Sequence, residues 1–306
     1  MSGELILGVD GGGARTRALL ADAGGRLLGR GNAGSSNYHV VGLEAAGRAL
    51  GEAIEDARHG AGRGPIRAAC FGLASVDRPS DQLLVNGWVA REGLTDRFCV
   101  VNNSELVLAA GTPEGWGLAL VAGTGSICIG RTADGREARA GGWGYLMGDE
   151  GGGYFIAVQA LHLATQTADG RAEAQGLLEA VLDEWGLEHP EQLLGFVYQR
   201  ETSPAEIAVL ADRVLALADA GDVHAGLLVD GAASALGRHV DTVAGRLAML
   251  EPPLAIGGGL LSSSARLREA LRASLTLPVG PLTLVEEPAQ GALQIARRLL
   301  SNEPPK

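Results

Sequence analysis

The residues with the clearest chemical potential lie near the N-terminus, where an acid is followed by three glycines. An apolar run, Leu5 to Val9, predicts a buried strand, and Asp10 and Gly11–Gly13 follow it directly. Glycines allow a backbone to come close to a ligand, and their N–H groups can line an anion site. This stretch therefore favours phosphate binding, and a tight hairpin that only reverses the chain is the alternative interpretation.

Lysine is almost absent from the chain, which limits how a phosphate could be bound. The only lysine among the 306 residues is Lys306. A Walker-type loop needs a lysine after its glycines, so that loop is excluded, as is a lysine Schiff base. A bound phosphate must be held by backbone N–H groups, hydroxyls, a metal or arginine.

The first glycine turn has a counterpart later in the chain. A shift of 112 residues places Val121 on Val9, Gly123 on Gly11, Gly125 on Gly13, Asp134 on Asp22 and Gly141 on Gly29. Both copies predict strand, glycine hairpin, strand, turn and strand. Single glycines match often by chance in a chain that has 47 of them, but the joint pattern predicts two similar domains facing one cleft.

Residues 141–153, GGWGYLMGDEGGG, directly follow this second copy. Seven of the thirteen are glycine, yet the segment also carries Trp143 and the adjacent acids Asp149 and Glu150. A merely flexible linker has no need of a tryptophan and two acids. We therefore expect a shaped loop that presents carboxylates to a ligand or metal, with a solvated surface loop as the alternative.

Polar residues also follow two further predicted strands. Asn102, Asn103 and Ser104 come after the strand at residues 98–101, which is where α/β proteins place ligand contacts. Gly257–Gly259 follow the strand at 253–256 and precede a helix at 265–274, whose N-terminus favours an anion or nucleotide.

Strands and amphipathic helices alternate between these segments, as in α/β proteins. A turn-rich break at residues 111–117 suggests the domain boundary. We therefore expect domains at 1–112 and 113–287, with a final helix at 288–300 packing back onto the first.

Composition excludes several classes of protein. The net charge of −11 argues against nucleic acid or an anionic membrane as partner, and no apolar run is long enough for a membrane span. Cys70, Cys99 and Cys128 are widely spaced, which predicts neither a disulfide framework nor a zinc cluster and favours a reducing cytoplasm. The six histidines lack metal-ligand spacing, so we expect core or surface roles for them.

The strand–DGGG turn, the GTGS hairpin and the late GGG together resemble the sugar kinase/Hsp70/actin superfamily. Within it, the GGWGYLMGDEGGG loop and the NNSELVLAAG–GTGS order resemble the N-acetylglucosamine kinase and BadF/BadG/BcrA/BcrD-type ATPase family. The resemblance runs from Leu5 to about Leu300. It implies two actin-like (ribonuclease H-like) α/β domains, each with a central mixed sheet, that close on ATP and an amino sugar. It also implies a homodimer.

Matching motifs assign roles to individual residues. Asp10 would hold Mg²⁺ through water. Phosphate and nucleotide contacts would come from Gly11, Gly12, Gly13, Thr16, Gly123, Thr124, Gly125, Gly258 and Ser262. Sugar contacts would come from Asn37, Asn103, Ser126, Gly142, Trp143, Gly144 and Asp149.

The chain departs from the family pattern at two positions. Ala14 stands where the family usually has Thr, and Thr16 is the hydroxyl that could replace it. Asn103 stands where the family usually has the Asp that takes the proton of the sugar hydroxyl. An amide cannot take that proton, and loss of a general base typically costs ~10²–10⁴-fold in rate.

Four outcomes follow from Asn103: weak activity, service by another acid such as Glu105 or Asp149, sugar binding without efficient transfer, or deamidation to Asp. The leading function is ATP-dependent phosphorylation of N-acetylglucosamine or glucosamine at the 6-hydroxyl. The alternatives are a non-catalytic sugar or nucleotide sensor and an ATPase that activates a redox partner. The redox role is disfavoured because the cysteines show no clustered pair in the sequence.

Overall fold

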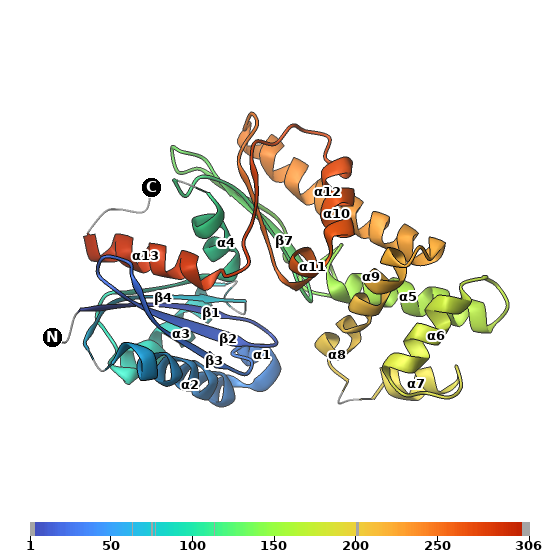
Figure 1. Ribbon diagram of the computed structural model, residues 1–306, viewed down its shortest axis with the longest axis horizontal. Helices are drawn as coiled ribbons and strands as arrows, with labels where there is room; N and C mark the ends of the chain where they lie inside the picture. The colour runs from blue at the N-terminus through green and yellow to red at the C-terminus, as the bar shows by residue number, and fades with distance from the viewer. Residues whose placement is uncertain are drawn as a thin grey trace.

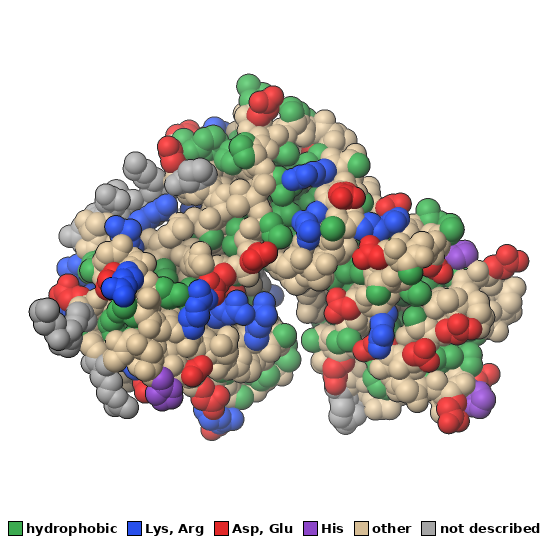
Figure 2. All heavy atoms as spheres, in the orientation of Figure 1, with side chains coloured by type: hydrophobic (Ala, Val, Ile, Leu, Met, Phe, Trp, Pro, Cys, Tyr) green, Lys and Arg blue, Asp and Glu red, His purple; other side chains and the backbone are tan. Residues whose placement is uncertain are grey.

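The structure is a computed structural model that describes residues 4–62, 64–74, 76, 78–112, 114–199 and 202–301. Two lobes, each built around a five-stranded sheet, are joined on one side (Figure 1), and the space-filling view shows a hollow between them on the other (Figure 2). The α/β class with two mixed sheets, expected from the sequence, is confirmed. None of the described helices has the length and apolar character needed to cross a membrane.

The first lobe has the strand order β3-β2-β1-β4-β5. An antiparallel meander opens it, and two strands parallel to the first complete it. Its strands are β1 (Leu5–Gly11), β2 (Thr16–Asp22), β3 (Leu27–Ala33), β4 (Ile66–Leu73) and β5 (Phe98–Asn102). Its helices are α1 (Tyr38–Val41), α2 (Leu43–Ala61) and α3 (Pro79–Glu92).

Helix α2 lies unusually close to the meander. Its apolar stripe, which includes Leu50 and Ile54, is buried against the sheet. A side chain on Gly31 of β3 would overlap the backbone carbonyl of Ala53, so only glycine allows this approach. The close packing fixes the meander whose first strand carries Asp10 near its end.

The second lobe has the order β10-β9-β6-β7-β8. Its strands are β6 (Gly117–Ala122), β7 (Ser126–Arg131), β8 (Glu137–Gly141), β9 (Leu254–Gly257) and β10 (Leu282–Leu284). Its helices are α5 (Gly153–Ala168), α6 (Gln175–Glu184), α7 (Gln192–Val197), α8 (Pro204–Ala208), α9 (Leu210–Asp219), α10 (Val223–Leu247), α11 (Gly259–Ser263) and α12 (Ala265–Ser274). The core of this lobe packs α10 and α5 against the sheet.

Helix α4 (Asn103–Gly111) connects the lobes, and α13 (Ala289–Ser301) packs beside it on the first sheet. Leu106 of α4 packs beneath the first sheet with Ala292 of α13, whereas Val107 and Leu108 pack on the second sheet. Helix α4 therefore belongs to both cores, and α13 lies across β1 and β4 (Figure 1). The boundaries at residues 112 and 287 stay a prediction.

The predicted duplication is visible in the sheets, since β1–β2–β3 and β6–β7–β8 are both antiparallel meanders. The fixed shift of 112 residues, however, is wrong after the first strand. Gly11 pairs with Thr16, but Ala122 pairs with Ser126, so the second glycine hairpin is the shorter one.

The next turn confirms this correction. Gly25 N donates to Asp22 O, and Gly135 N donates to Thr132 O in the same way. Asp22 therefore corresponds to Thr132 and not to Asp134, and the strand register matches Gly141 with Gly31 rather than Gly29. A different hairpin length shifts every later position, which a fixed-offset comparison cannot detect.

Candidate functional site

Two glycine hairpins lie at the inner ends of β1 and β6. In the first, Gly12 N donates to Arg15 O at 2.9 Å; in the second, Gly123 N donates to Gly125 O at 2.9 Å. Strand β1 runs from the N-terminus toward the hollow between the lobes, and α5 begins at that hollow (Figure 1). Figure 2 shows this hollow between the two lobes in space-filling form.

The second hairpin is hydrogen-bonded to the start of α5. Gly153 N donates to Gly123 O at 2.8 Å, and Tyr154 N donates to Thr124 O at 3.0 Å. Carbonyls of the hairpin thus satisfy the first N–H groups of the helix, which otherwise lack partners. Thr124 itself is exposed, so its side chain remains accessible to a ligand.

Asp10 is the acid at the end of β1. Burial raises the pKa of its carboxyl to about 6, while Arg15 and Arg17 act to lower it. No hydrogen bond to this carboxylate occurs within the described part of the chain. A bound cation would offset the cost of keeping this charge partly buried.

The donor set near Asp10 suits magnesium held mainly by phosphate. Among the described residues, no group of three or more His, Cys, Asp or Glu side chains could hold a metal ion by itself. Mg²⁺ usually keeps several waters and binds through one or two carboxylates plus substrate phosphates. A single acid beside glycine turns fits that pattern.

Thr16 supports the site from behind. It is fully buried, and its Oγ1 donates to Gly34 O at 2.7 Å. The hydroxyl proton is therefore used by the Gly34 carbonyl. The structure gives Thr16 a role in holding the loop at residues 34–37 rather than in binding phosphate.

The loop at residues 34–37 lies against the first hairpin. Ser35 Oγ donates to Gly12 O at 3.2 Å, and Asn37 N donates to Ser35 Oγ at 3.2 Å. The Asn37 Oδ1 atom accepts from His39 N and caps α1. Its amide NH₂ is left as the group that a sugar hydroxyl could meet.

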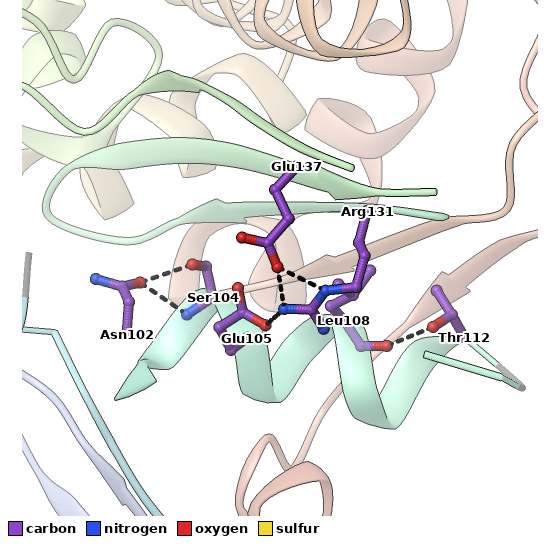
Figure 3. Close-up of polar contacts among 7 residues, drawn as sticks. All are labelled: Asn102, Ser104, Glu105, Leu108, Thr112, Arg131 and Glu137. Atoms are coloured by element: carbon purple, nitrogen blue, oxygen red, sulfur yellow. Dashed lines mark hydrogen bonds and ion pairs between the residues drawn. The ribbon is translucent and has the colours of Figure 1, made fainter. Parts of the chain in front are cut away.

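Asn103 follows the edge of the first sheet. Gly11, Leu73 and Asn102 lie side by side on β1, β4 and β5. Asn102 caps α4, because its Oδ1 accepts from Ser104 N at 3.0 Å and from Ser104 Oγ at 2.6 Å (Figure 3). Asn103 is thus the first residue of a helix that starts beside the Gly11 turn.

Glu105, the nearest acid in the sequence, is turned toward the other lobe. Arg131 of β7 binds it at 2.7 Å and also binds Glu137 of β8 at 2.8 Å (Figure 3). Burial raises the pKa of Glu105, and Arg131 acts against that shift. The expectation that Glu105 could serve as base is therefore wrong, since its carboxylate is held by Arg131.

Asp149 lies against the second hairpin. A side chain on Gly125 would overlap the Asp149 carboxylate, and Gly144 N donates to Asp149 Oδ1 at 3.3 Å. Asp149 also has a φ of 60°, a left-handed conformation that is uncommon for residues other than glycine. Such strain is concentrated at ligand sites, and here it aims a carboxylate at the hairpin.

Only some of the other residues of the 141–150 loop lie near Asp149 and the second hairpin. Gly142 N donates to Ser126 O at 2.9 Å. The Trp143 ring, in contrast, is 61% exposed and stacks with the guanidinium of Arg139 at 5.2 Å. The structure therefore brings Gly142, Gly144 and Asp149 to the hairpin and leaves Trp143 on the surface.

His239 of α10 is a contact that the sequence analysis missed. Its ring packs on Gly141, and its Nε2 lies 3.4 Å from Ser126 Oγ and 3.7 Å from the Glu150 carboxylate. Ser126 Oγ donates to Glu150 O at 2.7 Å. No spacing signal could reveal this residue, since it is almost ninety positions from the loop that it supports.

The third glycine turn packs on the end of β6. Gly258 has a φ of 93°, and a side chain there would overlap the Ala122 carbonyl. Ser262 is exposed on α11, and its N–H donates to Gly258 O at 3.0 Å. Gly258 therefore lies beside the second hairpin, as a nucleotide loop would.

The comparisons with known proteins cover nearly the whole chain. The model of the BadF/BadG/BcrA/BcrD ATPase family matches residues 7–296. An N-acetylmuramic acid/N-acetylglucosamine kinase of Clostridium acetobutylicum is 31% identical over 301 residues, which are 96% of this chain and 98% of the relative. An N-acetyl-D-glucosamine kinase of Dictyostelium discoideum is 31% identical over 289 residues, 89% of this chain and 90% of the relative.

Solved structures agree on the fold. A protein of Chromobacterium violaceum superposes with a TM-score of 0.77 at 30% identity, covering 98% of this chain and 100% of the other. A ROK family glucokinase of Streptomyces griseus, solved with glucose and AMPPNP, has a TM-score of 0.64 at 18% identity over 95% of this chain and 98% of the other. At that identity the second likeness supports the architecture alone.

Proposed function

The chain belongs to the BadF/BadG/BcrA/BcrD ATPase family, and on this premise we propose that it transfers the γ-phosphoryl group of ATP to the 6-hydroxyl of an amino sugar. N-acetylglucosamine is the first candidate because both curated relatives carry it in their names. Glucosamine is the second.

The observation that carries this proposal is the position of Asp10 beside a glycine turn in a chain without a usable lysine. Its carboxylate is partly buried, has no hydrogen bond among the described residues and faces Arg15 and Arg17. A cation and the phosphates that accompany it would compensate this charge, while backbone N–H groups of both hairpins meet the remaining phosphate oxygens.

When bound, Mg²⁺ would neutralise charge that develops on the transferred phosphoryl group. Asp10 would orient that ion through water. The first hairpin and Arg15 would contact phosphate from one lobe, and Thr124 with the second hairpin would contact it from the other. Phosphoryl transfer of this loose kind depends mainly on positioning and charge, which these groups supply without covalent catalysis.

Two residues would position the sugar. Asn103 would hydrogen-bond the attacking hydroxyl from the start of α4 without taking its proton. Asp149 would bind other hydroxyls from the second lobe, where its left-handed backbone conformation directs the carboxylate. A slow enzyme with normal sugar affinity follows from this arrangement.

We also propose that the enzyme is a homodimer of the cytoplasm. Leu146 and Met147 of the 141–150 loop are 80% and 76% exposed, and apolar groups this exposed are frequently covered by a partner subunit. Light scattering should give twice the chain mass of 31.3 kDa, and a single chain mass would contradict the dimer.

A substrate panel tests the proposed activity. The protein is incubated with ATP and Mg²⁺ and, separately, with N-acetylglucosamine, glucosamine, N-acetylmuramic acid and glucose, and ADP release is followed. We expect ADP with an amino sugar and a 6-phosphate in the product by ³¹P and ¹H NMR. Absence of ADP with every sugar, from protein that binds ATP, contradicts the proposal.

A further inference from the structure

Cys70 and Cys99 are brought together by the first sheet, although they are 29 positions apart in the chain. They are register partners on the parallel strands β4 and β5. Both belong to the apolar layer that Leu106 of α4 and Ala292 of α13 cover. Cysteine spacing alone gave no sign of this pair, because sheet order cannot be read from spacing.

The two thiols interact and differ in their surroundings. The neighbouring Cys70 thiol lowers the pKa of Cys99, whereas burial raises the pKa of Cys70. Cys70 is fully buried, but Cys99 is partly exposed on the last strand of its sheet. Cys99 is consequently the thiol that a small oxidant reaches, and its thiolate is the nucleophile.

Strand geometry permits a bond between them. Neighbouring strands lie roughly 4.7–4.9 Å apart, and disulfides occur at Cα separations of about 4.4–6.8 Å. The Cβ atoms must approach to about 3.8 Å, so one strand has to move. Among the described strands, β5 is paired on one side only, with β4, so it is the strand that can move. A bond formed with such adjustment is easily reduced again.

We propose that Cys70 and Cys99 are a reversible oxidation site that forms an intramolecular disulfide with hydrogen peroxide. The Cys99 thiolate attacks one peroxide oxygen, which gives a sulfenic acid and releases hydroxide. The Cys70 thiol then attacks the Cys99 sulfur, which forms the S–S bond and releases water. In sum, two thiols are oxidised and one peroxide is reduced to two waters, and a dithiol reductant reverses the change.

The cysteine pair lies three residues before the candidate site on the same two strands, so a bond between the thiols can displace the site. Leu73 and Asn102 are register partners on the same two strands, and Leu73 packs against Gly11. Movement of β5 toward β4 therefore displaces Asn102 and Asn103 relative to the first hairpin. This functional consequence rests on the proposed kinase activity, whereas formation of the disulfide does not.

Counting thiols tests the site directly. The folded protein is treated with hydrogen peroxide, alkylated after denaturation and digested for mass spectrometry. We expect one remaining thiol, at Cys128, and a linked Cys70–Cys99 peptide that disappears with dithiothreitol. Cys99→Ser and Cys70→Ala should abolish the linked peptide, and Cys128→Ser should keep it. Three intact thiols, a sulfinic acid at Cys99, or a bond between two chains would each overturn the proposal.

Activity provides the second readout. Oxidised wild type should lose at least about five-fold in phosphoryl transfer and recover with dithiothreitol, whereas Cys99→Ser should not respond to peroxide. If the disulfide forms and activity is unchanged, the coupling to Asn103 is refuted. If reduced wild type shows no activity at all, the proposed function has failed, and the linked peptide still decides the oxidation site.

Discussion

Ser126 and His239 meet beneath the 141–150 loop, with the serine Oγ 3.4 Å from the histidine Nε2. Ser126 also ties both ends of this loop, because its carbonyl accepts from Gly142 N and its hydroxyl donates to the Glu150 carbonyl. A helix of the core thus supports a loop that carries Asp149.

His239→Gln should weaken sugar binding without affecting the nucleotide. We expect KM for the sugar to rise several-fold, with KM for ATP and kcat nearly unchanged, because only the supports of Gly142 and Glu150 are disturbed. Steady-state kinetics with each substrate varied in turn measures this. His162→Gln, at an exposed position on α5, is the control and should behave as wild type.

The same histidine should give the loop a pH dependence. Burial and Arg238 lower the pKa of His239, and Glu150 acts against them. Because the pKa of His239 is lowered in the folded protein, the neutral ring contributes stability. That stability is complete above the unfolded pKa of about 6.5 and is lost as pH falls through the folded pKa. Sugar affinity should therefore fall below pH 6.5 in wild type and change less in His239→Gln, as titration calorimetry would show.

Asn103→Asp should restore the missing base. An acid at the start of α4 can take the proton of the sugar hydroxyl, so kcat should rise by about 10²-fold with a smaller change in KM. Asn102→Asp is the matched control, since the capping role of Asn102 toward Ser104 leaves it no part in proton transfer. Tight sugar binding with no turnover, in both the wild type and the Asn103→Asp variant, would identify a sugar sensor instead.

Asp10→Asn should be more stable than wild type and inactive. Because burial raises the Asp10 pKa to about 6, ionisation destabilises the fold, and the stability present below the ordinary pKa of 3.8 is lost as pH rises through 6. The free energy of unfolding at pH 7.5 should rise by up to about 2 kcal/mol, while Mg-ATP binding is lost.

Urea unfolding at pH 4.5 and 7.5 checks this prediction, and the gain should be smaller at pH 4.5, which lies between the two pKa values, than at pH 7.5. Asp134→Asn is the control from the second meander, where hydrogen bonds lower the pKa of the carboxyl, so that substitution should not stabilise. A loss of stability in Asp10→Asn at pH 7.5 would refute the burial argument.

Local patterns predicted the turns well and the relations between strands poorly. Asp10, Gly11 and Gly123 were placed at strand ends because an apolar run followed by glycine is a signal within a few residues. The partnership of Cys70 with Cys99 and the place of His239 depend on which distant elements become neighbours. Packing of the whole chain decides that, so no spacing rule could have found them.

The ion pair between Glu105 and Arg131 should contribute more to the free energy of unfolding than the exposed ion pairs of the surface do. It links α4, which begins with Asn103, to the second sheet, and its side chains are 24% and 20% exposed. Arg131→Met removes the cation and leaves the Glu105 carboxylate partly buried, so the free energy of unfolding should fall by roughly 1–3 kcal/mol at pH 8. Arg171→Met, which breaks an exposed pair with Asp169, should have little effect.

The pH dependence of this deficit distinguishes a buried charge from lost packing. Burial raises the pKa of Glu105 and Arg131 lowers it, so the pKa rises further in Arg131→Met. A raised folded-state pKa gives stability that is present below the unfolded value of about 4.3 and lost as pH rises through the folded value. The deficit of Arg131→Met should therefore be small at pH 4.5 and grow toward pH 8 in urea unfolding. Adding Glu105→Gln should recover part of it, because no carboxylate then remains to be buried, and a deficit independent of pH would show that the pair acts only by packing.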